Sequence, residues 1–92
     1  MSYELLYGAT ADEALARLEG DPEKAAALRA VDRTLVRLSD DPFNPRLGTT
    51  AFMTDPIGGV NATPARYDDW YVIWQCGGQS TIVIVAIHQV RL

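Results

Sequence analysis

The sequence is poor in the residues that build disulfides and metal sites. Its 92 residues include one cysteine, Cys76, and one histidine, His88. A single cysteine excludes an internal disulfide, and the two residues are too few for a zinc site, so we expect neither a metal nor another cofactor. No His or Asp lies close enough in sequence to activate Cys76. We therefore expect a buried structural thiol in a reducing compartment.

Long hydrophobic runs are also missing. The longest, residues 82–87, is far too short to span a bilayer. The first ten residues carry neither the basic region nor the apolar stretch of a signal peptide. The sequence therefore predicts a cytoplasmic protein that does not associate with membranes.

Positive charge is scarce, with 8 Lys and Arg against 12 Asp and Glu and a net charge of -4. Because phosphate binding relies on clustered Lys and Arg, this balance disfavours the ribosome or mRNA as a partner. The hydrophobic content of 48% and the absence of repeats are typical of a compact globular protein. We expect one domain covering residues 1–92.

Two apolar runs near the carboxyl end, 70–76 and 81–90, are joined by Gly77 and Gly78 and predict a strand hairpin. Alternation in the first run assigns one face to Trp70, Val72, Trp74 and Cys76, and the other to Tyr71, Ile73 and Gln75. The second run is apolar on both faces, as in a central strand. The rest of the chain should cover this hairpin.

The amino-terminal half predicts a strand and two helices. Residues 3–7 alternate like a strand, and Thr10 with Glu13 forms a capping-box pattern before a helix over 11–19, which Gly20 ends. Asp21 as N-cap and Pro22 at the first helical position begin a second helix that extends to about residue 39. The short connection predicts a helical hairpin.

The second helix has two distinct stripes. Its apolar stripe is Leu28, Val31, Leu35 and Leu38. Arg29, Arg33 and Arg37 recur on nearly the opposite side, and like charges at this spacing are mildly destabilising. This basic stripe is either a solvated face or a docking surface for an acidic partner.

Residues 43–64 are rich in Pro, Gly, Asn and Thr and predict mainly loop. A strand could form at 49–53 or at 60–67, and we favour the later segment because it leads into Trp70 through a turn at Asp68 and Asp69. Pro64 should place that strand at a sheet edge or a bulge. The predicted fold is α+β, with an N-terminal strand, a helical hairpin and a three-stranded antiparallel meander, in the order βααβββ.

This order and the following residues carry a resemblance to a known family. The helical hairpin ends at Leu38 with Asp41, Pro42, Asn44 and Pro45 after it. The meander reads Arg66, Tyr67, Asp68, Asp69, Trp70, Tyr71, Val72, Ile73 and Trp74, then Ala86, Ile87, His88 and Gln89. Over nearly the whole chain this pattern resembles the RelE/ParE toxins of bacterial type II toxin-antitoxin systems.

The resemblance implies a toxin that acts on translation or on a protein target, with a cognate antitoxin as its partner. Ribonuclease members of the family use basic residues on the open face of the meander. Here Tyr71 and Gln89 occupy two positions where the family has arginines, and neither side chain can supply a charge to a phosphate. The chain is thus expected to lack the usual RelE ribonuclease residues.

Candidate site residues follow from the same comparison. The candidate catalytic residues are His88, Arg66, Tyr71 and Arg91. The candidates for RNA or partner contact are Tyr67, Arg46, Gln89, Arg29, Arg33 and Arg37. The sequence favours a protein without enzymatic activity, and if the chain is an enzyme the resemblance implies a ribosome-dependent endoribonuclease. The alternative is a non-catalytic protein-binding or homodimerisation module on the same fold.

Overall fold

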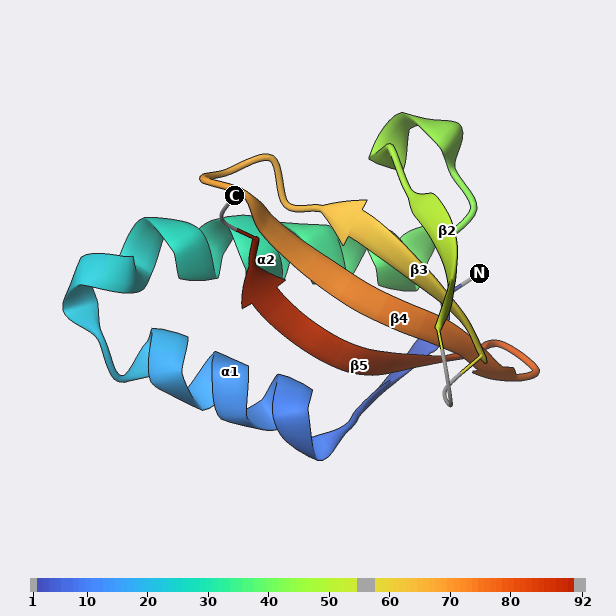
Figure 1. Cartoon of the computed structure of the whole chain (residues 1–92), viewed down its shortest axis with the longest axis horizontal. Helices are drawn as coiled ribbons and strands as arrows, with labels where there is room; N and C mark the ends of the chain where they lie inside the picture. Colours follow the sequence, from blue (N-terminus) through green and yellow to red (C-terminus); the bar gives the residue numbers. More distant parts are fainter. Residues whose placement is uncertain (1, 55–57, 91–92) are drawn as a thin grey trace.

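The computed structural model describes residues 2–54 and 58–90, and places a five-stranded sheet against two helices (Figure 1). The main elements are β1 Glu4–Tyr7, α1 Ala9–Glu19, α2 Ala25–Asp40, β2 Thr50–Thr54, β3 Gly58–Pro64, β4 Trp70–Gly78 and β5 Thr81–Gln89. Strands β2 to β5 form an antiparallel meander, and β1 joins the far edge parallel to β5. The predicted α+β class and element order are confirmed, with one strand more than predicted. Within the described residues no helix is long and apolar enough to cross a membrane.

The additional strand comes from the segment that the sequence disfavoured. Both candidate segments form strands, and β2 pairs with β3 from Thr50 opposite Ala62 to Thr54 opposite Gly58. Strand β3 is therefore internal, and the predicted edge position was wrong. Pro64 is tolerated because it is the last residue of β3 and lies beyond the part that β2 reaches. Its missing amide hydrogen is not needed for pairing on that side.

The helix boundaries differ from the predicted ones for local reasons. The amide of Gly8 donates to the Ile84 carbonyl and its own carbonyl accepts from Asp12, so β1 passes directly into α1. Thr10 then lies inside the helix, and the predicted capping box was wrong. Gly20 does end α1, as predicted. Asp21 caps as predicted, but it caps a 3-10 turn at Pro22–Lys24, and α2 proper begins at Ala25.

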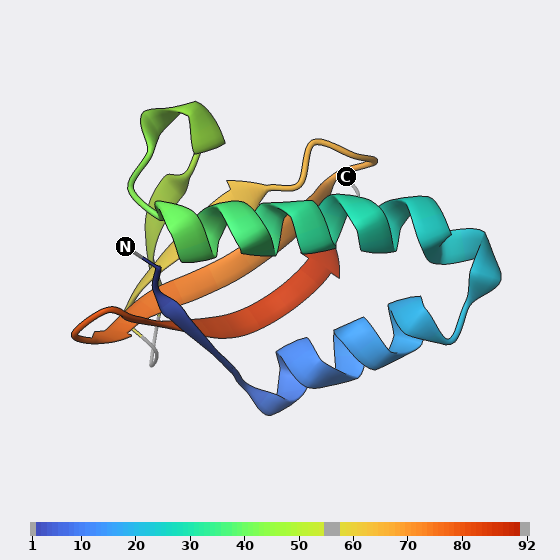
Figure 2. The same cartoon turned by 180° about the vertical axis from the view of Figure 1, so that it is seen from behind.

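The hydrophobic core lies between the helices and one face of the sheet (Figure 2). From α2 it takes Val31, Leu35 and Leu38, which confirms most of the predicted apolar stripe, while Leu28 is half-buried. From β4 it takes Val72 and Trp74. Because side chains alternate along a strand, their neighbours Tyr71 and Ile73 face away from the helices. The sheet thus has a covered face and an open face.

Strand β5 directs Ile82, Ile84 and Ile87 to the covered face although their spacing breaks strict alternation. The cause is a bulge at residue 85. Ile73 pairs with Ala86 while the next residue, Trp74, pairs with Ile84. The extra residue shifts the phase of the strand, so His88 emerges on the open face.

The end of the β4–β5 hairpin departs from two predictions. The turn is at Gln79 and Ser80, and not at the glycine pair, because β4 continues through Gly78 with a register shift at Gly77. Cys76 is exposed, and the predicted burial was wrong. The tip of the hairpin extends beyond the end of α2, so the covered face loses its cover there (Figure 2).

Candidate functional site

The open face of the sheet brings two of the candidate catalytic residues together. Tyr71 and His88 lie directly opposite each other on β4 and β5. They border a cavity of about 380 Å³ whose lining is Thr50, Phe52, Ala62, Tyr71, Ile73, His88 and Val90. His88 is exposed and Tyr71 is half-buried. A phenol and an imidazole side by side could exchange a proton with a bound group.

The described lining of the open-face cavity is uncharged apart from His88. Among residues 2–54 and 58–90 this lining contains no Lys or Arg, and apart from Thr50, Tyr71 and His88 it is apolar. Phosphoryl chemistry develops negative charge that a nearby cation or a set of donors must stabilise. The open face therefore offers acid-base groups without a cation in the same cavity, and its apolar lining fits a protein surface better than a polyanion.

Arg66 does not line the cavity at Tyr71 and His88. It lies in the loop at residues 65–69, where Arg66, Asp68 and Asp69 all have positive φ. Its guanidinium donates a 2.9 Å hydrogen bond from Nη2 to the carbonyl oxygen of Arg46. It shares a cavity of about 240 Å³ with Tyr71 and the exposed Tyr67, whereas His88 lines other cavities. Arg91 is outside the described residues.

The same loop explains what Gln89 does in the fold. Its side-chain amide donates to the backbone oxygen and to a carboxylate oxygen of Asp68, both at 2.8 Å. The Val90 amide donates to the Asp69 carbonyl at 2.8 Å. The end of β5 thereby fixes the loop, which confirms Asp68 and Asp69 as turn residues. Partner contact through Gln89 stays a prediction.

Two arginines of the predicted basic stripe line a third cavity together with Arg66. This cavity has a volume of about 190 Å³ and is lined by Arg33, Thr34, Arg37, Leu47, Pro64, Ala65 and Arg66. Arg29, one turn earlier on α2, is exposed and is not part of this lining. Two arginines of the stripe, Arg33 and Arg37, therefore line a cavity, and Arg29 does not. Sequence spacing linked the three helical arginines but gave no signal that Arg66 would join them.

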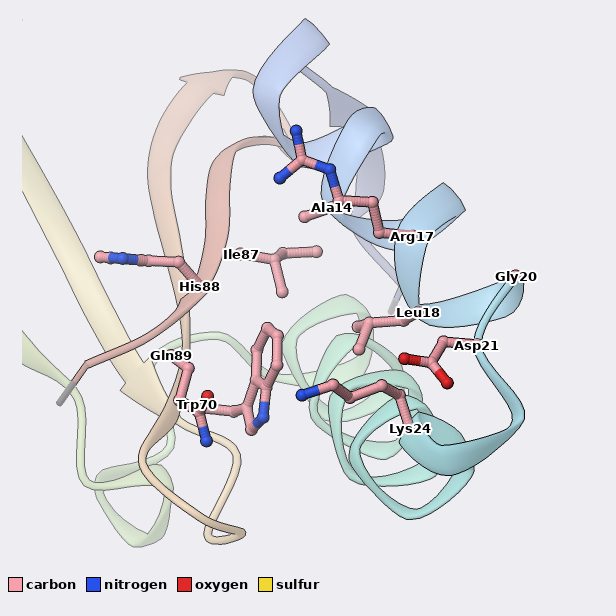
Figure 3. Close-up of a pocket in the computed structure, with 10 residues that line it drawn as sticks. All are labelled: Ala14, Arg17, Leu18, Gly20, Asp21, Lys24, Trp70, Ile87, His88 and Gln89. Atoms are coloured by element: carbon pink, nitrogen blue, oxygen red, sulfur yellow. The ribbon is translucent and has the colours of Figure 1, made fainter.

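A cavity of about 680 Å³ lies between the end of α1 and the adjoining ends of β4 and β5 (Figure 3). Its apolar surface comes from Ala14, Leu18, Trp70 and Ile87, and its charged residues are Arg17, Asp21 and Lys24. In Figure 3 the Trp70 ring lies between Ile87 and Lys24, and the His88 ring points away from the group. We call this surface the Trp70 groove. The sequence placed Trp70 on the face of the hairpin that the rest of the chain should cover, and gave no signal for a groove.

Metal binding has no support from the side-chain positions. Within residues 2–54 and 58–90, no group of three or more His, Cys, Asp or Glu side chains could hold an ion. The chemistry available is therefore that of Tyr71 and His88 on the open face, of the arginines at their own cavity, and of the apolar surfaces.

Comparison with solved structures identifies the fold as that of the RelE/ParE toxins of toxin-antitoxin systems. A YoeB/ParE toxin from Agrobacterium tumefaciens matches 96% of this chain and 99% of its own, with a TM-score of 0.77 at 8% identity. The RelBE2 toxin-antitoxin complex from Mycobacterium tuberculosis matches 98% of this chain and 100% of the compared chain, with a TM-score of 0.66 at 20% identity. The resemblance seen in the sequence is thus confirmed for the fold.

At the level of sequence the chain has no such match. No protein-family model matches it, and no curated protein sequence matches it. At 8% and 20% identity the two structural matches define the fold alone. Activity has to be argued from the surfaces of this chain.

Proposed function

We propose that this chain is the toxin-like component of a type II toxin-antitoxin pair, and that it acts by binding a protein target without cleaving RNA. The fold supports the first part. The second part rests on one observation, which is that the cavity at Tyr71 and His88 has no Lys or Arg among the described residues of its lining. A 2'-hydroxyl attack in this cavity would find no cation among those residues to stabilise the phosphorane oxygens.

The open face has the character of a protein-binding surface. Phe52 is 51% exposed and Val90 is 38% exposed at the border of the cavity, with the half-buried Ile73 beside them. Apolar side chains that stay exposed around a concave surface mark sites of protein contact more often than isolated ones do. Tyr71 adds an amphipathic ring of the kind enriched at interfaces.

Inducible expression in a bacterium tests this function. Growth should stop with the wild-type chain and continue with Phe52→Glu, because a charge on the exposed ring position blocks an apolar contact. His88→Ala should still stop growth, since the imidazole has no catalytic role in this proposal. Circular dichroism spectra and melting curves check that both variants fold.

Two outcomes would overturn the proposal in different ways. If His88→Ala and Tyr71→Phe both restore growth while Phe52→Glu does not, the open face carries catalysis. The wild-type chain should also be expressed in several bacterial hosts, without any gene that neighbours its own. If growth is unaffected in all of these hosts, the toxin assignment fails.

A cognate antitoxin is the proposed partner, because one structural match is a toxin-antitoxin complex. We assign its contact to the Trp70 groove, where Arg17 and Lys24 stand beside an apolar surface. This combination fits an apolar segment flanked by carboxylates. Arg17 is 81% exposed, and its distance to Glu13 is 4.0 Å, so the pair is weak and Arg17 can exchange partners.

Co-purification with any small protein that is encoded next to this chain tests the partner. Lys24→Glu should weaken the complex by roughly tenfold, through repulsion of the partner carboxylates. Arg29→Glu is the matched control, since it makes the same charge change on α2 outside the groove. Equal weakening by both variants would show that only net charge matters and would remove the groove assignment.

A second copy of this chain is the alternative occupant of the open face, favoured by the same exposed Phe52 and Val90. In that case the protein is a dimerisation module. Sedimentation velocity at micromolar concentration distinguishes a second copy from another protein on the open face. A dimer that dissociates in Phe52→Glu supports the dimerisation module, and a monomeric wild-type chain excludes it.

A further inference from the structure

The cavity formed by Arg33, Arg37 and Arg66 is a concentration of positive charge in an acidic protein. The chain has 8 basic residues and a net charge of -4, yet three guanidinium groups border a single cavity of about 190 Å³. The other lining residues are Thr34, Leu47, Pro64 and Ala65, so no carboxylate is among them. Within the described part of the chain, the one recorded ion pair is Arg17 with Glu13, elsewhere on α1. The three cations are therefore not neutralised by the fold.

Arg66 is held in place before any ligand arrives. Its Nη2 donates to the Arg46 carbonyl at 2.9 Å, and its own backbone has a φ of 59°, which a non-glycine residue rarely adopts. Gly48 leaves room for the Arg66 guanidinium, because a Cβ atom on residue 48 would lie 3.0 Å from Nη2 of Arg66. A guanidinium has five N–H donors in a rigid fork, and this arrangement uses one of them. The remaining donors are pre-oriented for an acceptor with several oxygens.

Arg33 and Arg37 lie one turn apart on α2 and line the same cavity as Arg66. Like charges four residues apart on a helix repel each other, and the approach of a third cation adds to this. This repulsion is small for the helical pair, and an anion bound beside the two cations would offset it. The fold thus accepts a small destabilisation that a doubly charged anion would relieve.

We propose that this cavity binds the phosphate group of a phosphate monoester or inorganic phosphate. Three arginines match a dianion better than the single charge of one carboxylate, and their planar forks match tetrahedral oxygens in bidentate fashion. The overall acidity of the chain opposes a long polyanion, so a terminal phosphate fits and a continuous nucleic-acid backbone does not. The cavity shares no lining residue with the cavity at Tyr71 and His88, and the proposal does not depend on the toxin assignment.

Titration of the full chain with inorganic phosphate, followed by 1H–15N NMR at constant ionic strength, tests the proposal. The Arg Nε resonances of residues 33, 37 and 66 and the amides of Leu47 and Ala65 should shift together. Arg66→Gln should weaken binding by roughly tenfold or more, in keeping with the loss of a charge-assisted hydrogen bond. The double variant Arg33→Gln/Arg37→Gln should do the same, and it keeps the test decisive if Arg66→Gln fails to fold.

Arg29→Gln is the matched control, because it removes one charge from the same helix outside the cavity. It should leave phosphate binding within about twofold of wild type. Equal losses in Arg29→Gln and Arg66→Gln, or equal shifts with chloride at the same ionic strength, would overturn the site.

The source of the phosphate is resolved by comparing five probes. Inorganic phosphate, a nucleoside 5'-monophosphate and a 5'-phosphorylated oligonucleotide should all compete for the cavity. A 5'-hydroxyl oligonucleotide that binds as tightly as its phosphorylated form would overturn the preference for a terminal phosphate. A short polyglutamate peptide that binds more tightly than phosphate would assign the cavity to an acidic protein segment instead.

Discussion

The indole nitrogen of Trp74 donates a 2.8 Å hydrogen bond to the side-chain oxygen of Thr63 across β3 and β4, deep in the covered face of the sheet. Trp74 is 1% exposed and Thr63 is fully buried. The Thr63 oxygen also lies 2.6 Å from the hydroxyl of Thr49, so one buried hydroxyl joins β3, β4 and the segment before β2. This pair fixes the sheet whose opposite face carries Tyr71.

Thr63→Val should therefore destabilise the protein more than its similar shape suggests. It leaves the indole N–H without its acceptor in a dry environment, which costs about 1–3 kcal/mol. Thr63→Ser keeps the hydroxyl and should cost less. Urea unfolding followed by tryptophan fluorescence measures both, and a smaller loss for valine than for serine would contradict the importance of the hydrogen bond.

Gly48→Ala should destabilise the fold through backbone strain and through Arg66. Gly48 has a φ of 72°, where a Cβ atom costs about 1–2 kcal/mol. The new methyl would also crowd Nη2 of Arg66. Gly58→Ala is the control, because Gly58 has a φ of 91° and its Cβ would meet nothing within 4 Å. Both variants should lower the free energy of unfolding, but only Gly48→Ala should shift the Arg66 side-chain NMR signals.

Gln89→Ala should loosen the loop at residues 65–69 without unfolding the sheet. It removes two exposed hydrogen bonds to Asp68, each worth about 0.5–1.5 kcal/mol at most. Gln89→Glu should loosen the loop further, because an ionised carboxylate cannot donate a hydrogen bond and repels the carboxylate of Asp68. Amide hydrogen exchange of residues 65–69 measures the effect. Equal protection in all three proteins would show that other contacts hold the loop.

The stability of the protein should fall in alkaline solution partly because of Tyr7. Burial raises the pKa of the Tyr7 phenol above its usual value of 10.0, with smaller contributions from Asp32 and Asp12. The folded chain then holds the phenolic proton more tightly than the unfolded chain does. The contribution of Tyr7 to the free energy of unfolding is therefore fully present below pH 10, and it is lost as the pH rises through the raised pKa of Tyr7.

Tyr7→Phe should remove this alkaline dependence and leave stability at lower pH nearly unchanged. Melting temperatures measured across a series of alkaline buffers give the comparison. Tyr67→Phe, in the exposed loop, controls for the loss of a phenol elsewhere in the chain. An unchanged alkaline slope in Tyr7→Phe would assign the dependence to other groups.

Local patterns predicted most of the elements but not their exact limits. The apolar stripe of Val31, Leu35 and Leu38 defined the buried side of α2, and alternation around Val72 and Trp74 defined the covered face. The ends of an element differ from the predicted ones where a contact with a residue far along the chain replaces a pattern in the nearby sequence. Gly8 replaced the Thr10 cap because its amide pairs with Ile84, which lies far along the chain.

The open face was only partly predictable for the same reason. Alternation places Tyr71 away from the helices, but the position of His88 depends on the bulge at residue 85, which shifts β5 against β4. The exposure of Cys76 likewise follows from where α2 ends relative to the hairpin tip. Neither feature has a signature in the nearby sequence, because each results from the fit of one element to another.

The sequence by itself determined the α+β class, the order of elements and the RelE/ParE-like pattern, since these follow from apolar periodicity and from Gly and Pro breakers that act over a few residues. Only the tertiary structure decided that Arg66 meets Arg33 and Arg37 while His88 meets Tyr71. Arg66 follows Arg33 by more than thirty positions along the chain. Their shared cavity depends on how α2 packs against the sheet, and packing is a property of the assembled core.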